Sequence, residues 1–599
     1  MDLGADTEGD TPSTSSAPSN LATKLLSLWA HGKLSAVECK SSPTWPHLMV
    51  AAILKLQLLE QLGILKSSHE IATGPLVRPF CNQLSVPEPG LVTCKCFDPK
   101  TSKIIDEDVA IFYPHLMFSA LAESYPEVFQ RLFKLHELPE FWEQTLARDD
   151  DRLVNHPATL EKGWEQVTIP LFTHGDGVEY ESRDSLMVWS FGPLLSQEQS
   201  LDSHLLMAAW PKSCTCKDTW PQLWKELAWS FKALAKGQHP THDADGNPLK
   251  KGSPFWAKKG KPLASGLKAI VWCIEGDHEF FSNSLGLPHW RNASPCWNCD
   301  CTQAAGEKPY NKLHPWDQFT EVDHSWAQAF PSSEHPLLTE VPGNSSRLVR
   351  GDALHILFTK GLYGHLLGSI LHYLCWYDEG AHQATKPADR LGIIFKEVQA
   401  VYTGKEVTCR LTNLVLSMFT DPKKPWANWA NLSCKGGEGK HLAPCLLEVL
   451  KNILDFSKPE HSHMLKCLEH VCQVVAIWDS AGTFLTKAEF KKSWQLAQDA
   501  MKEYQWLNAW SEDCGRSSFH IVIKHHTFLH LAKDAWYLNP RVFWCFKAED
   551  YVGHISTVTH SVSMGVKATK ISQKLAIKYR ILLHLLYTRP GFHLQTEVE

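Results

Sequence analysis

The sequence predicts an α/β fold in which a β-sheet is followed by a long helical insertion. Two apolar, β-branched runs, residues 167–174 and 266–275, are typical of buried strands, and each is followed by a Gly-Asp pair. Helical periodicity then dominates residues 348–511. Between the two Gly-Asp runs lie two more apolar runs and one helical pattern: residues 186–191, 205–210 and 220–235.

Three strands, a helix and another strand is the element order of an RNase H-like core. In that arrangement the first and fourth strands lie side by side, so Asp176 and Asp277 are expected at adjacent strand ends. The neighbouring glycines would let the backbone turn there. The alternative is that Asp176-Gly177 is an ordinary turn between two strands, without a role in chemistry.

The composition limits which classes of protein this chain can belong to. At 599 residues the chain has room for several domains, and its 24 Trp favour a folded protein over a disordered one. The formal charge of −6 means that nucleic-acid binding would need local basic patches. The 18 scattered Cys favour a reducing compartment. No secretory signal is expected, because the N-terminus is acidic and rich in Ser and Thr. No membrane span is expected either, because the most apolar stretch, 353–376, contains one lysine and three histidines. A soluble intracellular protein is therefore predicted.

The chain divides into six predicted parts. These are an acidic, Ser-rich disordered tail (1–20), a mostly helical N-terminal region (21–160), the first part of the core (161–290), a Cys/His segment (291–347), a helical insertion (348–511) and the last part of the core (512–599). Within the insertion the expected helices are 353–375, 391–401, 408–419, 443–456, 464–480 and 487–506. A basic amphipathic helix is expected at 567–587, either docked on the core or gripping phosphates.

A Cys-x-x-Cys pair, Cys296 and Cys299, predicts a zinc site, because a turn of that length brings two thiolates to one ion. One pair does not complete a site. Cys301 and His289 are the predicted further ligands, with His314 or the Cys214-x-Cys216 pair as alternatives. The competing interpretation is a loop with free thiols.

Two basic groups are candidates for DNA binding. The first surrounds Phe255-Trp256 and the second lies late in the chain, where His526 and His530 share a helix face. That spacing also suits a metal pair or core packing, and a structural or DNA-facing role is favoured over catalysis. The predicted DNA-binding residues are Lys250, Lys251, Lys258, Lys259, Lys524, His526, His530 and Arg541.

Taken together, several short sequence motifs resemble those of the DDE-type transposases of the Plavaka and CACTA-like group, or of their domesticated derivatives. They occur in order over residues 167–583: Gly276-Asp277-His-Glu, Cys296-x-x-Cys299, Gly351-Asp352-x-x-His355, Lys524-x-His526-x-x-x-His530 and Trp544-Cys-Phe-x-x-Glu549-Asp550.

The resemblance implies an RNase H-like core that cleaves and transfers DNA strands. Its three acids would be Asp176, Asp277 and Glu549, with Asp550 or Glu438 as the alternative third acid. Such acids hold two Mg²⁺ or Mn²⁺ ions. The resemblance also implies a structural Zn²⁺, DNA as partner, homo-oligomers and a nuclear location. A catalytically degenerate derivative that binds DNA or protein is the alternative, and an unrelated zinc-stabilised helical scaffold would leave Asp176 and Asp277 far apart.

Overall fold

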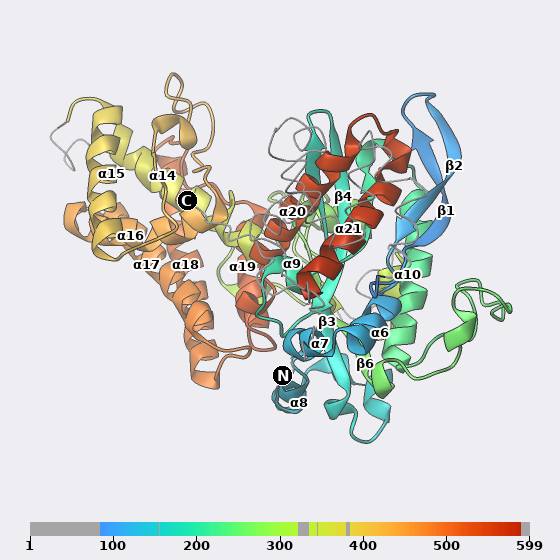
Figure 1. The fold of residues 1–599 in the computed structure, drawn as a ribbon. Coiled ribbons are helices and arrows are strands. Elements are labelled where there is room, and N and C mark those ends of the chain that lie inside the picture. The colour runs from blue at the N-terminus through green and yellow to red at the C-terminus, as the bar shows by residue number, and fades with distance from the viewer. Residues whose placement is uncertain (1–83, 155, 322–334, 344–345, 379–383, 589–599) are drawn as a thin grey trace, which may run out of the picture.

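In the computed structural model the chain has two lobes, one built on a β-sheet and one of helices (Figure 1). The structure describes residues 84–154, 156–321, 335–343, 346–378 and 384–588. The predicted disordered tail (1–20) and the predicted helices before residue 84 lie outside the described residues.

The sheet has six strands in the order β1-β2-β5-β4-β3-β6. Strands β3, β4 and β5 follow one another antiparallel, and β6 lies parallel to β3. Helix α10 (Thr219–Lys236) connects β5 to β6. The strands and helix predicted between residues 167 and 275 are therefore confirmed. Their bounds are β3 Thr168–Glu181, β4 Asp184–Pro193, β5 Leu205–Pro211 and β6 Lys268–Glu275.

The described part of the N-terminal region contains a pair of strands besides the predicted helices. Strands β1 (Gly90–Asp98) and β2 (Lys103–Ile111) form a hairpin that extends the sheet next to β5. Cys94 and Cys96 point into the core while Thr93 and Lys95 are exposed, the alternation of a half-buried strand. Short helices follow, in the segment where helix was expected: α6 Pro114–Ser124, α7 Pro126–Phe133 and α8 Leu138–Leu146.

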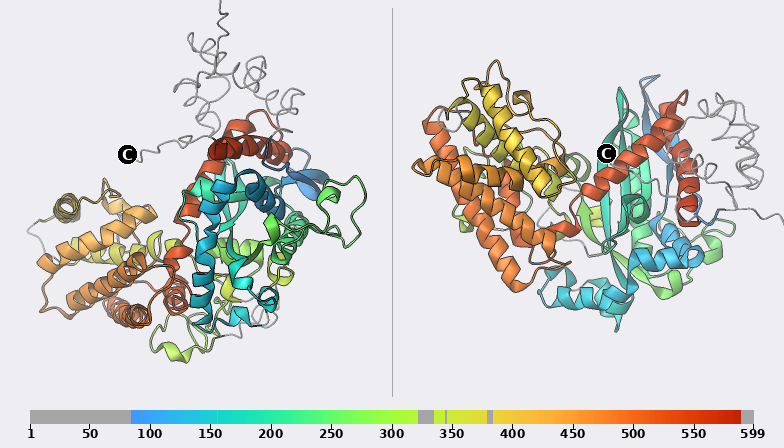
Figure 2. Two further views of the ribbon diagram at one scale, coloured as in Figure 1. Left: turned by 60° about the horizontal axis from the view of Figure 1, so that its bottom comes forward. Right: turned by 60° about the vertical axis from the view of Figure 1, so that its left-hand side comes forward.

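Helices cover both faces of the sheet (Figures 1 and 2). On one face α10 packs so that Trp224 meets Trp189 of β4 at 4.4 Å between ring centroids. On the other face α20 (Phe546–Ser563) packs on β3 and β4, and α21 (Ile571–Thr588) packs on β2 and β5. The predicted basic C-terminal helix is thus docked on the core, with Lys574, Lys578 and Arg580 buried. None of them is available to grip phosphates.

Helices occur at the ranges predicted between residues 348 and 511, with one exception, and they form the second lobe. Residues 408–419 are not a helix but part of a long connection with a single 3-10 turn, Leu416–Met418. A π-helical turn, Leu354–Phe358, leads into the lobe. Its helices are α14 Leu362–Trp376, α15 Pro387–Gly404, α16 Gly436–Ile453, α17 Pro459–Ser480 and α18 Lys487–Asp513.

Helix α19 (Ile523–Asp534) returns the chain from the helical lobe toward the sheet, where α20 begins. Among the described helices, none combines the length and the apolar character that crossing a bilayer requires. The remaining short helices are α9 Ser200–Ser203, α11 His278–Leu285 and α13 Pro336–Thr339.

Candidate active site and metal centre

The two Gly-Asp pairs meet at one edge of the sheet. The parallel pairing of β3 and β6 ends with His174 opposite Glu275, and Asp176 and Asp277 each lie two residues further on. Strand β3 continues through Asp176 to Glu181, so Asp176-Gly177 is not the turn that was the alternative. Asp277 instead caps helix α11, because its Oδ1 accepts a hydrogen bond of 2.6 Å from the Phe280 amide.

The glycines before each aspartate make room for Phe280. A Cβ at Gly175 or at Gly276 would come within 2.2 Å of the Phe280 ring. Neither glycine has a positive φ, so the expected turning of the backbone is not their function. Close packing of α11 against both strands requires them, and that packing fixes the two aspartates next to each other.

The Asp176 carboxyl group lies among other acids. Burial, followed by the charges of Glu549 and Asp277, raises its pKa to about 7. The Gly177 amide donates a 2.6 Å hydrogen bond to Asp176 Oδ1 and opposes this shift. A carboxyl group with such a pKa gains strongly from a nearby cation.

Helix α20 brings Glu549 to the same edge, from its first turn. Burial raises the pKa of Glu549, as do the charges of Asp352 and Asp277. The two alternative third acids are engaged elsewhere. Asp550 accepts a hydrogen bond from Ser200 Oγ and lies 3.5 Å from His554 Nε2. Glu438 accepts from the Lys435 amide and caps helix α16.

A buried aspartate that the sequence analysis left without a role organises this site. Asp352 is 3% exposed, and its Oδ1 accepts hydrogen bonds from the amides of Leu354 (2.8 Å) and Cys545 (3.1 Å). Cys545 is the residue before α20. Asp352 therefore ties the start of the helical lobe to the helix that carries Glu549.

The other oxygen of Asp352 holds His355. Nδ1 of His355 lies 2.5 Å from Asp352 Oδ2, and its Nε2 lies 3.7 Å from Glu549 Oε1. Burial favours the neutral ring, but Asp352, then Glu549 and Asp277, raise the pKa of His355 to about 9. The ring is thus a cation among the acids at neutral pH.

Lys524 is the second cation at this edge. Its Nζ donates to the carbonyls of Thr359 (3.3 Å) and Lys360 (3.2 Å), directly after the π-helical turn. Burial lowers the pKa of Lys524, and the charges of Asp352 and Asp277 act in the opposite direction. The first turn of α19 therefore faces the acids.

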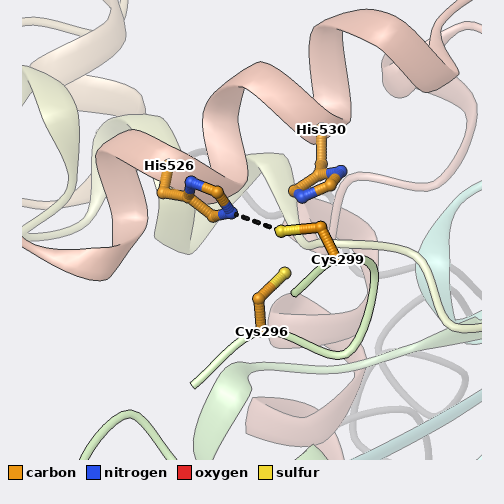
Figure 3. Close-up of side chains that lie close together, drawn as sticks. All are labelled: Cys296, Cys299, His526 and His530. Carbon is orange, nitrogen blue, oxygen red and sulfur yellow. Dashed lines mark hydrogen bonds between the residues drawn. The ribbon is translucent and has the colours of Figure 1, made fainter. Parts of the chain in front are cut away.

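The next turns of α19 face a cysteine loop. His526 and His530 point from one side of the helix toward Cys296 and Cys299 (Figure 3). One ligand atom from each residue lies within 4.8 Å of the others, and all four side chains are buried. Cys299 Sγ and His526 Nε2 are 3.1 Å apart. Two thiols and two imidazoles at this spacing are a ligand set that can hold a metal ion.

This grouping corrects the predicted ligands. His289 lies outside the group: its Nδ1 accepts from the Arg291 amide at 3.1 Å, and its ring lies on Trp290. Cys301 is buried beside the pair and exchanges a hydrogen bond with Cys296, but it is not one of the four. Although burial opposes it, contacts with Cys299, Cys301 and His530 hold the pKa of Cys296 well below its usual value.

His526 and His530 are also not DNA-facing as predicted, because both are buried. Of the remaining predicted DNA-binding residues, Lys524 faces the acids and the other five lie on the surface. Lys250 and Lys251 are exposed, as is Arg541, which donates to the Asp479 carbonyl. Lys258 pairs with Glu123 (2.8 Å), and Lys259 Nζ lies 4.9 Å from the Trp256 ring centroid.

Three residues at the acid edge were not predicted as site residues from the sequence: Asp352, His355 and Glu275. Asp352 and His355 stand three apart, which is a visible spacing, but only the fold shows that His355 lies between Asp352 and Glu549. Glu275 is a third case. It is buried below the acids, and burial together with the Asp352 charge raises its pKa well above the usual value. Nothing in an apolar strand signals that its last residue is a buried acid with a raised pKa.

A scan against protein-family models and a search of the curated proteins return no match to this chain.

Proposed function

We propose that this chain is a transposon-derived protein that cleaves and transfers DNA strands with a carboxylate-bound metal site. The strand order supports an RNase H-like core: three antiparallel strands, a connecting helix, and a fourth strand parallel to the first. The observation that carries the proposal is the convergence of Asp176, Asp277 and Glu549 at one edge of that sheet.

Asp176, Asp277 and Glu549 suit Mg²⁺ or Mn²⁺, because hard divalent cations prefer carboxylate oxygens. When bound, such ions would activate a water or a 3′-hydroxyl and stabilise the leaving oxygen. The protein's own cations have a complementary role. Lys524 and His355 lower the negative potential of the acid edge, which favours the approach of a DNA phosphate.

The buried group of two cysteines and two histidines suits Zn²⁺, which prefers four sulfur and nitrogen ligands. Its role here would be structural. An ion held by Cys296, Cys299, His526 and His530 fastens the cysteine loop to α19, and the same helix presents Lys524 to the acids.

Strand cleavage tests the acid site directly. Nicking of supercoiled plasmid with Mg²⁺ or Mn²⁺ should be lost, by about 100-fold or more, in Asp176→Asn, Asp277→Asn and Glu549→Gln. Asp550→Asn is the matched control on the same helix and should retain activity. Nicking that survives all three acid substitutions would rule out the proposed site.

A second candidate is a degenerate derivative that binds DNA without cleaving it. Two observations favour it. Within the described residues no three of the acids have ligand atoms within 4.8 Å of one another, and His355 Nε2 lies 3.7 Å from Glu549 Oε1. Calorimetric titration with Mn²⁺ separates the two. An active site should bind Mn²⁺ and lose that binding in Asp176→Asn, whereas a degenerate protein would bind DNA but no Mn²⁺ at these acids.

Metal analysis of the purified chain tests the zinc proposal. We expect about one zinc per chain, as for a four-ligand site. Cys296→Ser and His530→Asn should lose the metal, whereas His289→Ala and Cys301→Ser should keep it. Loss in His289→Ala with retention in His530→Asn would restore the ligand set predicted from the sequence.

DNA as the partner, assembly into homo-oligomers on DNA ends and a nuclear location belong to the same proposal. They rest on the resemblance and on the acid site together.

A further inference from the structure

The long connection between α15 and α16 exposes two tryptophans on the helical lobe. In residues 420–433, which we term the Trp426 loop, the Trp426 side chain is 66% exposed and that of Trp429 is 39% exposed. Tryptophan is usually well buried, so a ring that is two-thirds exposed indicates a contact surface. Lys423 and Lys424 precede Trp426 and are exposed as well.

The backbone that carries these side chains is held in place. The Leu432 amide donates to the Gly364 carbonyl of α14 (2.8 Å), and the Ala430 amide to the Ser517 carbonyl (3.1 Å). A Cβ at Gly364 or at Gly368 would come within 2.6 Å of Asn431 or Leu432, so these glycines let the loop lie directly on α14.

The tip of the loop is fixed by its own set of bonds. The Ser517 hydroxyl donates to the Trp426 carbonyl (2.8 Å), and Thr420 Oγ1 donates to that of Pro425 (3.0 Å). The Trp426 ring is therefore displayed by an ordered frame, which lowers the entropy cost of binding a partner.

The loop contacts the segment that precedes α19. The Trp429 ring stacks on His520, with centroids 4.5 Å apart and planes 16° apart. His520 precedes α19 by three residues, and Lys524 in the first turn of α19 faces the acids. The loop thus contacts the segment that leads into α19.

Charge favours a nucleic acid as the occupant. Although the whole chain carries a formal charge of −6, the connection at 405–435 holds five basic and two acidic residues. Asp421, one of the two acids, is exposed and accepts a hydrogen bond from the amide of Lys423 (2.9 Å). Adjacent lysines and exposed indole rings are the combination that binds single strands, by phosphate contact and base stacking.

We propose that the Trp426 loop binds unpaired DNA, with a base stacked on the Trp426 ring and the flanking phosphates on Lys423 and Lys424. This inference rests on the DNA partner of the proposed function. A single strand is favoured over a duplex, because bases within a duplex have both faces covered.

Fluorescence anisotropy with a labelled oligothymidylate strand, in buffer without added divalent cations, tests the proposal apart from catalysis. Trp426→Ala should weaken binding of the strand about tenfold, the loss expected for one stacked base, and Trp426→Phe should restore most of it. Affinity for a duplex of the same length should be unchanged. Lys423→Ala with Lys424→Ala should lower the salt dependence of log K by about 1.4, the value for two phosphates of a single strand.

Phe456→Ala is the matched control, since Phe456 is 54% exposed on the loop between α16 and α17. Three results would overturn the proposal: unchanged strand affinity in Trp426→Ala, an equal loss for duplex, or a loss no larger than in Phe456→Ala. A change of self-association in sedimentation velocity without a change of strand affinity would make the loop a protein contact, which also overturns it. Because Asp176→Asn should bind the strand like the wild type, absence of nicking would leave this test intact.

Discussion

At the scale of single residues, the acid edge makes the folded protein sensitive to pH. The pKa of Asp176 is raised from 3.8 to about 7, so between these values the folded chain holds a proton that the unfolded chain has lost. The stability that this side chain contributes is fully present below the lower value and is lost as pH rises through the upper one.

Asp176→Asn should therefore be relatively more stable than the wild type in alkaline solution. We expect its free energy of unfolding to gain roughly 1–3 kcal/mol on the wild type between about pH 4 and pH 8, because a neutral amide avoids the repulsion. Urea unfolding in buffer without divalent cations measures this gain. If the two proteins keep a constant difference in stability over that range, the acids do not interact as described.

His355 should show the opposite dependence. Its pKa is raised from 6.5 to about 9, so the stability that it contributes is present below the lower value and lost as pH rises through the upper one. His355→Gln leaves the buried Asp352 carboxylate without its cation and should cost about 2 kcal/mol near pH 6 and less near pH 9.

Thermal unfolding at several pH values measures this effect, and His554→Gln is the matched control. His554 also lies beside an acid of α20, but its partner Asp550 is largely exposed. A deficit in His355→Gln that grows between pH 6 and pH 9 would contradict the ion pair with Asp352.

At the scale of elements, the position of α11 depends on space next to two strands. Gly276→Ala should destabilise the protein by about 1–3 kcal/mol, because the new methyl group overlaps the Phe280 ring. Phe280→Ala removes that ring and leaves room. In the double variant the added cost of Gly276→Ala should therefore nearly vanish, which a double-mutant cycle in urea detects.

The control is Gly392→Ala in α15, where a Cβ meets nothing within 4 Å. There the change should stabilise the helix by about 0.5–1 kcal/mol. Additive costs of Gly276→Ala and Phe280→Ala would show that α11 does not depend on this contact.

Much of the sheet and of the helical lobe could be predicted, because burial leaves apolar runs in the strands and a helical spacing of apolar residues in the helices. The strands from β3 to β6 are continuous apolar runs, since both faces of the sheet are covered by helices. The hairpin β1–β2 was not predicted, although Cys94 and Cys96 point into the core and Thr93 and Lys95 are exposed. Residues 408–419 have a helical pattern of leucines, yet they pack as a connection.

The individual motifs of the candidate sites could be predicted from the sequence, but which motifs come together in space could not. The Cys-x-x-Cys and the His-x-x-x-His are each visible, but 227 residues separate Cys299 from His526, and only the return of α19 brings them together. In the same way, Asp352 and His355 form a short motif, but their contacts are with distant residues. Asp352 accepts from the Cys545 amide, and His355 lies beside Glu549. Local patterns do not encode such long-range contacts.

At the scale of the whole molecule, α19 joins the two candidate sites, which lie where the helical lobe meets the sheet lobe (Figure 1). Its side chains at positions 526 and 530 face the cysteine loop, and Lys524 at its start faces the acids. A metal ion held by the cysteines would hence limit the motion of Lys524.

Removal of that ion should loosen α19 without unfolding the protein. Metal–ligand bonds contribute to stability only where the ligands are, and α19 keeps the packing of Phe528 against Trp478 of α17 when the ion is gone. In hydrogen exchange followed by mass spectrometry, a zinc chelator should speed exchange about tenfold or more in peptides from 296–301 and 523–534. Peptides from the β1–β2 hairpin and from α15 should be unchanged. Cys299→Ser, which would bind no zinc, should already show the faster exchange and should not respond to the chelator. Faster exchange throughout the wild-type chain would instead mean that the metal supports the whole fold, and an unchanged α19 would mean that the four residues hold no metal.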